Sequence, residues 1–221
     1  MVRLLRAAAS SIQALLDIVL PRKERVVRAL QYSHEDLFVT PTEHTACGIT
    51  ITTLLSYREK PVEDCIRAVK YDRSTPAAKL LAEVLTEYLR EEIAQLHSFS
   101  TKTVFLIPIP LHRKRYSERG FNQIELICAH LPDEFRDGSL ARIGTDILMR
   151  VRETESQTRL SRTERLMNVK GAFVVSHVDT VLNTHVILID DVTTTGATLA
   201  EAARPLLNLE IPVSALALAR A

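Results

Sequence analysis

The sequence predicts an α/β fold: a doubly wound, mainly parallel sheet with a small helix and hairpin unit at the N-terminal end. Apolar segments rich in β-branched residues alternate along the chain with segments of helical periodicity, as in strands joined by crossover helices. The clearest example is the run 186–199. There four apolar residues lead into two adjacent carboxylates, a turn rich in Thr and Gly, and an Ala-rich helical pattern. This order is typical of a buried parallel strand followed by a helix.

The composition is that of a chain with a full apolar core and little net charge. Of the 221 residues, 46% are apolar and the formal net charge is +1, so no global field marks a nucleic-acid binder. No run approaches the roughly 18 apolar residues of a membrane span. Cys47, Cys65 and Cys128 form no C-x-x-C pair, which argues against a structural zinc and suits a reducing cytosol. We therefore expect a cytoplasmic protein without zinc.

The N-terminal half is predicted to contain helices and one hairpin. Gln13 and Asp17 interrupt the first apolar stretch, so an amphipathic helix is favoured there over a signal peptide. The expected elements, in chain order, are that helix over 1–20, a strand over 49–57 that pairs with 37–39 as a hairpin, a short helix opening at Pro61, and a long helix from Thr75-Pro76 to about 93.

The C-terminal half alternates strands and helices. Pro205 lies inside the helical pattern that follows Thr198, so we expect a kink or an early end of that helix. The expected elements are a strand over 104–110, a charged loop over 111–120, a helix carrying Ile124, Ile127 and Leu131, a strand over 146–151, a helix that begins at a capping box over 161–164, and strands over 173–176, 186–191 and 213–219.

The turn after the 186–191 strand has the chemistry of a ribose phosphate site. Small hydroxyl residues and a Gly allow consecutive backbone N–H groups to converge on a phosphate at the positive end of a helix. Asp190 and Asp191 repel a phosphate, so they are suited to hydroxyl groups or a metal ion. No Lys follows Gly196 and no G-x-G-x-x-G occurs, which excludes the Walker and dinucleotide motifs. The candidate phosphate loop comprises Thr193, Thr194, Thr195, Gly196, Ala197 and Thr198.

This run resembles the phosphoribosyl diphosphate signature of type I phosphoribosyltransferases, in which an apolar strand, two acidic residues and a Thr/Gly loop follow one another. The resemblance implies that Asp190 and Asp191 hold the ribose hydroxyls and Mg²⁺, and that the loop 193–198 holds the 5-phosphate. It also implies the type I phosphoribosyltransferase fold.

Two further segments complete the candidate site. The segment 107–123 follows a predicted strand and contains Arg113, Lys114, Arg115 and Arg119, whose charges suit a diphosphate. Taken alone, it is equally well read as a solvated basic loop. The second segment is the polar stretch 152–168, in which Arg152, Gln157 and Arg165 belong to a flexible loop that could close over the ligand.

The order of the motifs resembles the ComF family of phosphoribosyltransferase-like proteins. The motifs are P-x-P-L-H at 108–112, R-G-F-N-Q at 119–123, a polar loop, G-A-F at 171–173 and the Asp-Asp loop. The resemblance covers roughly residues 57–221 and implies a role in competence and DNA uptake, with competence proteins as partners. Many members carry an N-terminal zinc finger, but Cys47 is the only Cys before residue 65, so we expect no zinc here. We therefore divide the chain into a subdomain at the zinc-finger position, 1–56, and a phosphoribosyltransferase domain, 57–221.

Two functions are compatible with these motifs. The first is a transferase that binds phosphoribosyl diphosphate with Mg²⁺ and passes the phosphoribosyl group to a nitrogen acceptor. The second is a non-catalytic protein that binds a phosphoribosyl ligand or acts as a scaffold in DNA uptake. Direct nucleic-acid binding through the Arg residues of 150–165 is the least favoured, because aromatic residues for base stacking are missing and Glu residues dilute the charge.

Overall fold

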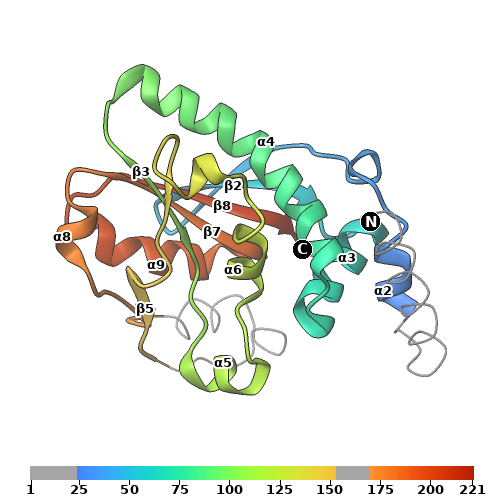
Figure 1. The fold of residues 1–221 in the computed structure, drawn as a ribbon. Helices are drawn as coiled ribbons and strands as arrows, with labels where there is room; N and C mark the ends of the chain where they lie inside the picture. Colours follow the sequence, from blue (N-terminus) through green and yellow to red (C-terminus); the bar gives the residue numbers. More distant parts are fainter. Residues whose placement is uncertain (1–23, 153–169) are drawn as a thin grey trace, which may run out of the picture.

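A computed structural model describes residues 24–152 and 170–221 (Figure 1). Within these residues a central six-stranded sheet has the strand order β1-β2-β8-β7-β3-β4. The strands are β1 (Thr42–Ala46), β2 (Ile49–Ser56), β8 (Val213–Arg220), β7 (His185–Thr193), β3 (Val104–Pro108) and β4 (Arg142–Ile143).

The sheet is mainly parallel. Strand β1 runs antiparallel to β2, and each of the other neighbouring pairs is parallel. The expected α/β fold with a mainly parallel sheet is therefore confirmed. Because parallel strands end at a common edge, the residues that follow β2, β8, β7 and β3 lie along one carboxyl edge of the sheet. The register brings Pro108 beside Ile189, and Arg220 beside both Thr193 and Ser56.

Helices cover both faces of the sheet (Figure 1). Ile187 and Ile189 of β7 pack on one side with α3, α4 and α6, while Val186 and Leu188 pack on the other side with α9. This alternation along a strand that is buried on both faces explains its continuous apolar run. The helices are α3 (Lys60–Asp72), α4 (Thr75–Phe99), α6 (Gln123–Cys128) and α9 (Ala197–Leu207).

The N-terminal hairpin differs from the expected one. Strand β2 pairs with residues 42–46, and not with residues 37–39 as we predicted. The turn between the strands consists of Cys47 and Gly48, both with positive φ (50° and 86°), as a two-residue hairpin turn requires. Pairing with 37–39 would need a longer loop. The boundary drawn at residue 57 directly follows β2, and the division into two domains stays a prediction.

A second, two-stranded sheet was not expected. Strands β5 (Leu148–Arg150) and β6 (Phe173–Val175) pair antiparallel with each other, whereas the sequence pattern suggested two strands of the main sheet. Strand β4, which pairs with β3, was missed because its two residues carry no periodicity. The helix expected to begin at residues 161–164 and the amphipathic helix over 1–20 lie outside the described residues.

The segment 113–119 is a helix, α5 (Arg113–Arg119), and not the charged loop that we expected. No residue of α5 is buried, so the sequence contains no apolar pattern that would predict this helix. The helix begins after the N-cap His112 and ends before Gly120, which has φ of 80°. Of the two outcomes expected at Pro205, the early end is not seen at the proline itself, because helix α9 continues two residues further and ends at Leu207. The kink stays a prediction.

Four short helical segments complete the described structure. They are α2 (Glu24–Ala29), η1 (His34–Asp36), η2 (Asp133–Phe135) and α8 (Val178–Val181). Within 24–152 and 170–221, no helix has both the length and the apolar character needed to cross a membrane.

Candidate ligand site at the carboxyl edge of the sheet

Strand β7 ends in the acidic pair that the sequence singled out. Asp191 is 6% exposed, and its Oδ2 accepts a hydrogen bond from Gln123 Nε2 at 3.0 Å while its Oδ1 accepts one from the Val192 N–H at 2.8 Å. The neighbouring Asp190 Oδ1 accepts a hydrogen bond from the Asp191 N–H at 2.9 Å. Both carboxylates are thus held in fixed orientations at the sheet edge.

The environment of Asp190 favours its protonated form. Burial, and next the charge of Asp191, raise the pKa of Asp190 well above its usual range, and the Arg150 guanidinium only partly opposes them. Two adjacent carboxylates with so little positive charge near them are suited to a bound cation or to hydroxyl groups that donate hydrogen bonds. This electrostatic situation is the one expected of a binding site.

The loop after β7 is shaped by its own hydroxyl groups. Thr193 Oγ1 accepts a hydrogen bond from the Gly196 N–H at 3.1 Å, and Thr195 Oγ1 accepts one from the Ala197 N–H at 3.4 Å. Gly196 has φ of 77° and serves as the N-cap of α9. The backbone amides of the loop therefore gather at the positive end of an 11-residue helix.

Gly196 is also fixed by packing against the N-terminal hairpin. A Cβ atom at this position would lie 2.3 Å from Ile51 Cδ1, 2.6 Å from Ala46 Cβ and 3.6 Å from His44 Nε2. The loop thus needs glycine for two reasons, its left-handed backbone and the close approach of strands β1 and β2.

A pocket of about 170 Å³ connects this acidic pair to helix α5. Arg115 and Arg119 are one helical turn apart, and both line the pocket together with Asp190, Asp191 and Thr198. The segment after β3 and the segment after β7 therefore lie close together, as expected, because the two strands pair in parallel and end at the same edge of the sheet. Arg113 and Lys114 are exposed and do not line this pocket.

Three polar or charged residues of the pocket were not assigned to the site from the sequence: Lys70, Gln123 and Arg150. Gln123 connects the two halves of the site, since its Oε1 accepts a hydrogen bond from Arg119 while its Nε2 donates to Asp191. The Arg150 guanidinium lies 5.4 Å from the ring centre of Phe173. Burial, and next the charge of Arg115, lower the pKa of Arg150. The R-G-F-N-Q motif contained Gln123, but no sequence pattern indicated its partner 68 residues away.

The candidate flexible segment is described only at its start. Arg152 donates a hydrogen bond from Nη1 to the Lys170 carbonyl at 2.8 Å, so Arg152 and Lys170 lie together beside strands β5 and β6. Gln157 and Arg165 lie outside the described residues.

Comparison with known proteins identifies relatives that are named for competence or for DNA utilization. No family model matches the chain. The DNA utilization protein YhgH of Escherichia coli O6:H1 is 32% identical over 152 residues, which cover 67% of this chain and 62% of the relative. Competence protein ComFC of Streptococcus pneumoniae is 28% identical over 69% of this chain and 59% of its own length. Competence protein F of Haemophilus influenzae is 29% identical over 72% and 67%, respectively.

The matched part thus spans about 62% of the length of the first of these relatives. The three relatives share the competence and DNA utilization names of one family, and the motif order along this chain had already indicated that family. The chain belongs to the ComF family.

Proposed function

We propose that this chain binds phosphoribosyl diphosphate with Mg²⁺, adopts the type I phosphoribosyltransferase fold and transfers the phosphoribosyl group to a nitrogen acceptor. The observation that carries the proposal is the pocket in which the acidic pair and Thr198 face Arg115 and Arg119. One side of this pocket suits ribose hydroxyls and a phosphate, and the other suits a diphosphate. We propose phosphoribosyltransferase activity for residues 57–221 and a metal-free accessory role for residues 1–56.

The side chains have separate tasks in this reaction. Asp190 and Asp191 hold the ribose hydroxyls and stabilise the positive charge that develops on the ribose ring. Arg115 and Arg119 bind the leaving diphosphate. Gln123 holds the side chains of Arg119 and Asp191 in position through one hydrogen bond to each. The two carboxylates offer the hard oxygen ligands that Mg²⁺ prefers, and the raised pKa of Asp190 indicates that the pair lacks positive charge. When bound, Mg²⁺ neutralises charge on the diphosphate.

The relatives' names suggest the setting of this activity. These relatives are named for competence and for DNA utilization, so we propose a cytoplasmic role in DNA uptake with competence proteins as partners. A binding protein without turnover is the second candidate, because each feature of the pocket described above serves ligand binding.

Calorimetric titration of phosphoribosyl diphosphate tests the proposal. We expect binding that depends on Mg²⁺, followed by diphosphate release when a panel of nitrogen bases is added. Binding without release for any base would favour the second candidate. Absence of binding at millimolar ligand with Mg²⁺ would reject both.

Arg115 is expected to recognise the diphosphate and not the 5-phosphate. Arg115→Ala should weaken phosphoribosyl diphosphate binding at least tenfold and change ribose 5-phosphate binding less than threefold, because only the first ligand carries the diphosphate. Arg142→Ala is the matched control, since Arg142 is an exposed arginine on β4 that does not line the pocket. An equal loss for both ligands would contradict this assignment of Arg115.

A further inference from the structure

The imidazole of His44 is a titratable group that has no task in the function proposed above. It lies on β1, and its Nδ1 and Nε2 are both buried without a hydrogen-bond partner among the described residues. Native structures leave few buried polar atoms in this state, because each of them costs free energy. The side chain as a whole is partly exposed, since β1 lies at an edge of the sheet, so a small movement of the ring gives a proton access to it.

The His44 ring packs against the candidate phosphate loop. His44 and Ala46 are two residues apart and therefore point to the same face of β1, and both lie close to Gly196. A Cβ atom on Gly196 would lie 3.6 Å from His44 Nε2. Gly196 and Ala197 contribute their backbone amides to the N-terminus of α9. The imidazole is thus a near neighbour of the amides that are proposed to bind phosphate.

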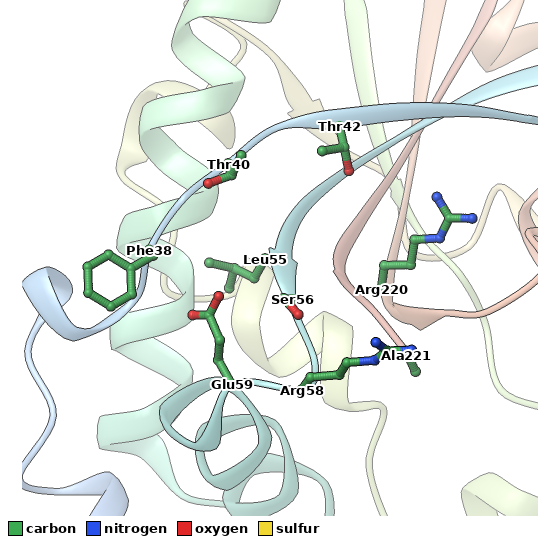
Figure 2. A pocket seen from close by; sticks show the side chains of 9 residues that line it. All are labelled: Phe38, Thr40, Thr42, Leu55, Ser56, Arg58, Glu59, Arg220 and Ala221. Carbon is green, nitrogen blue, oxygen red and sulfur yellow. The ribbon is translucent and has the colours of Figure 1, made fainter.

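Arg220 is the charged group near His44 among the described residues. It ends β8 and is the register neighbour of Thr193. Figure 2 shows the Arg220 guanidinium extending from the end of β8 toward β1, and Arg220 lines one pocket with Thr42, which shares a face of β1 with His44. The other elements around the ring contribute no ionisable side chain, since β2, the loop 193–196 and the first turn of α9 have none. Glu43 points to the opposite face of β1.

These surroundings favour the neutral ring in the ligand-free protein. Burial, and next the positive charge of Arg220, lower the pKa of His44. The first ionisable residue of α9, Glu201, does not compensate this charge, because it accepts a hydrogen bond from the Gly171 N–H and pairs with Arg204. A phosphate at the loop supplies the negative charge that these surroundings lack, so it favours the imidazolium form of His44.

We propose that phosphate binding at the loop 193–198 is coupled to protonation of His44, so that the affinity of the loop for a phosphate ester rises as the pH falls. The inference rests on the proposed function, since it takes this loop as the phosphate site. His44 acts through its charge and not through contact with the ligand, because its ring nitrogens are buried. The coupling is reciprocal: a proton on His44 strengthens phosphate binding by the same factor by which phosphate strengthens protonation.

The affinity of ribose 5-phosphate for wild type and His44→Gln, measured from about pH 5 to about pH 8.5, tests this coupling. We expect the variant to bind at least about fivefold more weakly than wild type at the acid end and within about twofold of it at the alkaline end, where the wild-type ring is also neutral. The ratio of the two dissociation constants is compared, because the ligand phosphate and Asp190 also titrate and contribute to both proteins. A merely structural role of His44 would change this ratio by one factor at every pH.

His130→Gln is the matched control for this variant. Nε2 of His130 is likewise buried without a partner among the described residues, and burial, and next the charges of Lys79 and Arg136, lower the pKa of this histidine. None of these residues belongs to the phosphate loop or to the hairpin. We expect His130→Gln to follow wild type at every pH. The same acid-dependent loss of affinity in both variants would overturn the assignment to His44.

An NMR titration of the imidazole groups in the wild-type chain is the second measurement, and it does not depend on the stability of a variant. The pKa of His44 should rise when ribose 5-phosphate saturates the loop, and its proton affinity should increase by the factor found in the binding experiment. If ribose 5-phosphate binds but the His44 titration is unchanged, or the ratio is constant with pH, the coupling is overturned and the proposed function stands. If ribose 5-phosphate does not bind at millimolar concentration at any pH, the loop is not the phosphate site and both proposals fall.

Discussion

Replacing Asp190 by Asn is expected to weaken phosphoribosyl diphosphate binding about a hundredfold and to stabilise the ligand-free protein. The loss of affinity follows because the amide provides one acceptor oxygen where the carboxylate provides two, and no charge for Mg²⁺ or for the ribose. The fold should tolerate the change, because the Asn oxygen can still accept the hydrogen bond that Asp190 Oδ1 receives from the Asp191 N–H. Calorimetry of binding and thermal unfolding at several pH values measure the two effects.

The gain in stability has a defined pH dependence. The pKa of Asp190 in the folded protein is raised above the value of an unfolded Asp, about 3.9. Folding therefore favours the protonated form, and ionisation of Asp190 lowers stability as the pH rises from about 4 toward the raised pKa. Asn does not ionise, so the stability difference should be small near pH 4 and reach about 1–2 kcal/mol at and above neutral pH, or about 2–8 °C in Tm.

Two controls separate this effect from a general consequence of removing a carboxylate. Asp179 is exposed, and Asp179→Asn should leave both binding and Tm nearly unchanged at every pH. Asp191→Asn should weaken binding but not stabilise the fold, since its amide would face the Gln123 amide that now donates to Asp191 Oδ2. A Tm for Asp190→Asn that falls at neutral pH would contradict the role assigned to the acidic pair.

The part of the site that could be predicted from the sequence is the part that is contiguous in the chain. Strand β7, the acidic pair and the turn to α9 follow one another directly, and each has its own chemical signature. The parallel pairing of β3 with β7 also followed, because alternating strands and helices bring the ends of both strands to one edge. These two inferences suffice to place Arg115 and Arg119 near Asp190, and the pocket contains all three residues.

The remainder depends on contacts that periodicity does not encode. Helix α5 buries none of its side chains, so the amphipathic pattern of a helix was absent, and only its caps define it. Strands β5 and β6 have three residues each, too few to indicate whether they join the main sheet or pair with each other. The link from Gln123 to Asp191 spans 68 residues and needs the full fold to be recognised. The ligand-binding roles of all the site residues stay predictions, including those of Arg113, Lys114, Gln157 and Arg165, which do not line the pocket or lie outside the described residues.

Replacing Gly196 by Ala is expected to destabilise the protein by about 2–5 kcal/mol and to remove phosphate binding by the loop. The added methyl group would overlap Ile51 Cδ1 and Ala46 Cβ, and the alanine would also have to adopt φ of 77°. Relief of the overlap requires the loop to move away from the hairpin, which displaces the Gly196 and Ala197 amides at the N-terminus of α9. The measurements are Tm, expected to fall by about 10 °C, and the affinity for ribose 5-phosphate.

Gly48→Ala is the matched control for this variant, because Gly48 has φ of 86° but no atom within 4 Å of an added Cβ. That variant carries only the cost of the left-handed backbone, about 1–2 kcal/mol, and it changes a residue of the hairpin turn and not of the loop. We expect Gly48→Ala to keep full affinity for ribose 5-phosphate. Equal destabilisation in both variants would mean that Ile51 and Ala46 of the hairpin shift at little cost to make room for a methyl group at position 196. Unchanged ribose 5-phosphate affinity in Gly196→Ala would mean that the loop after β7 is not the phosphate site.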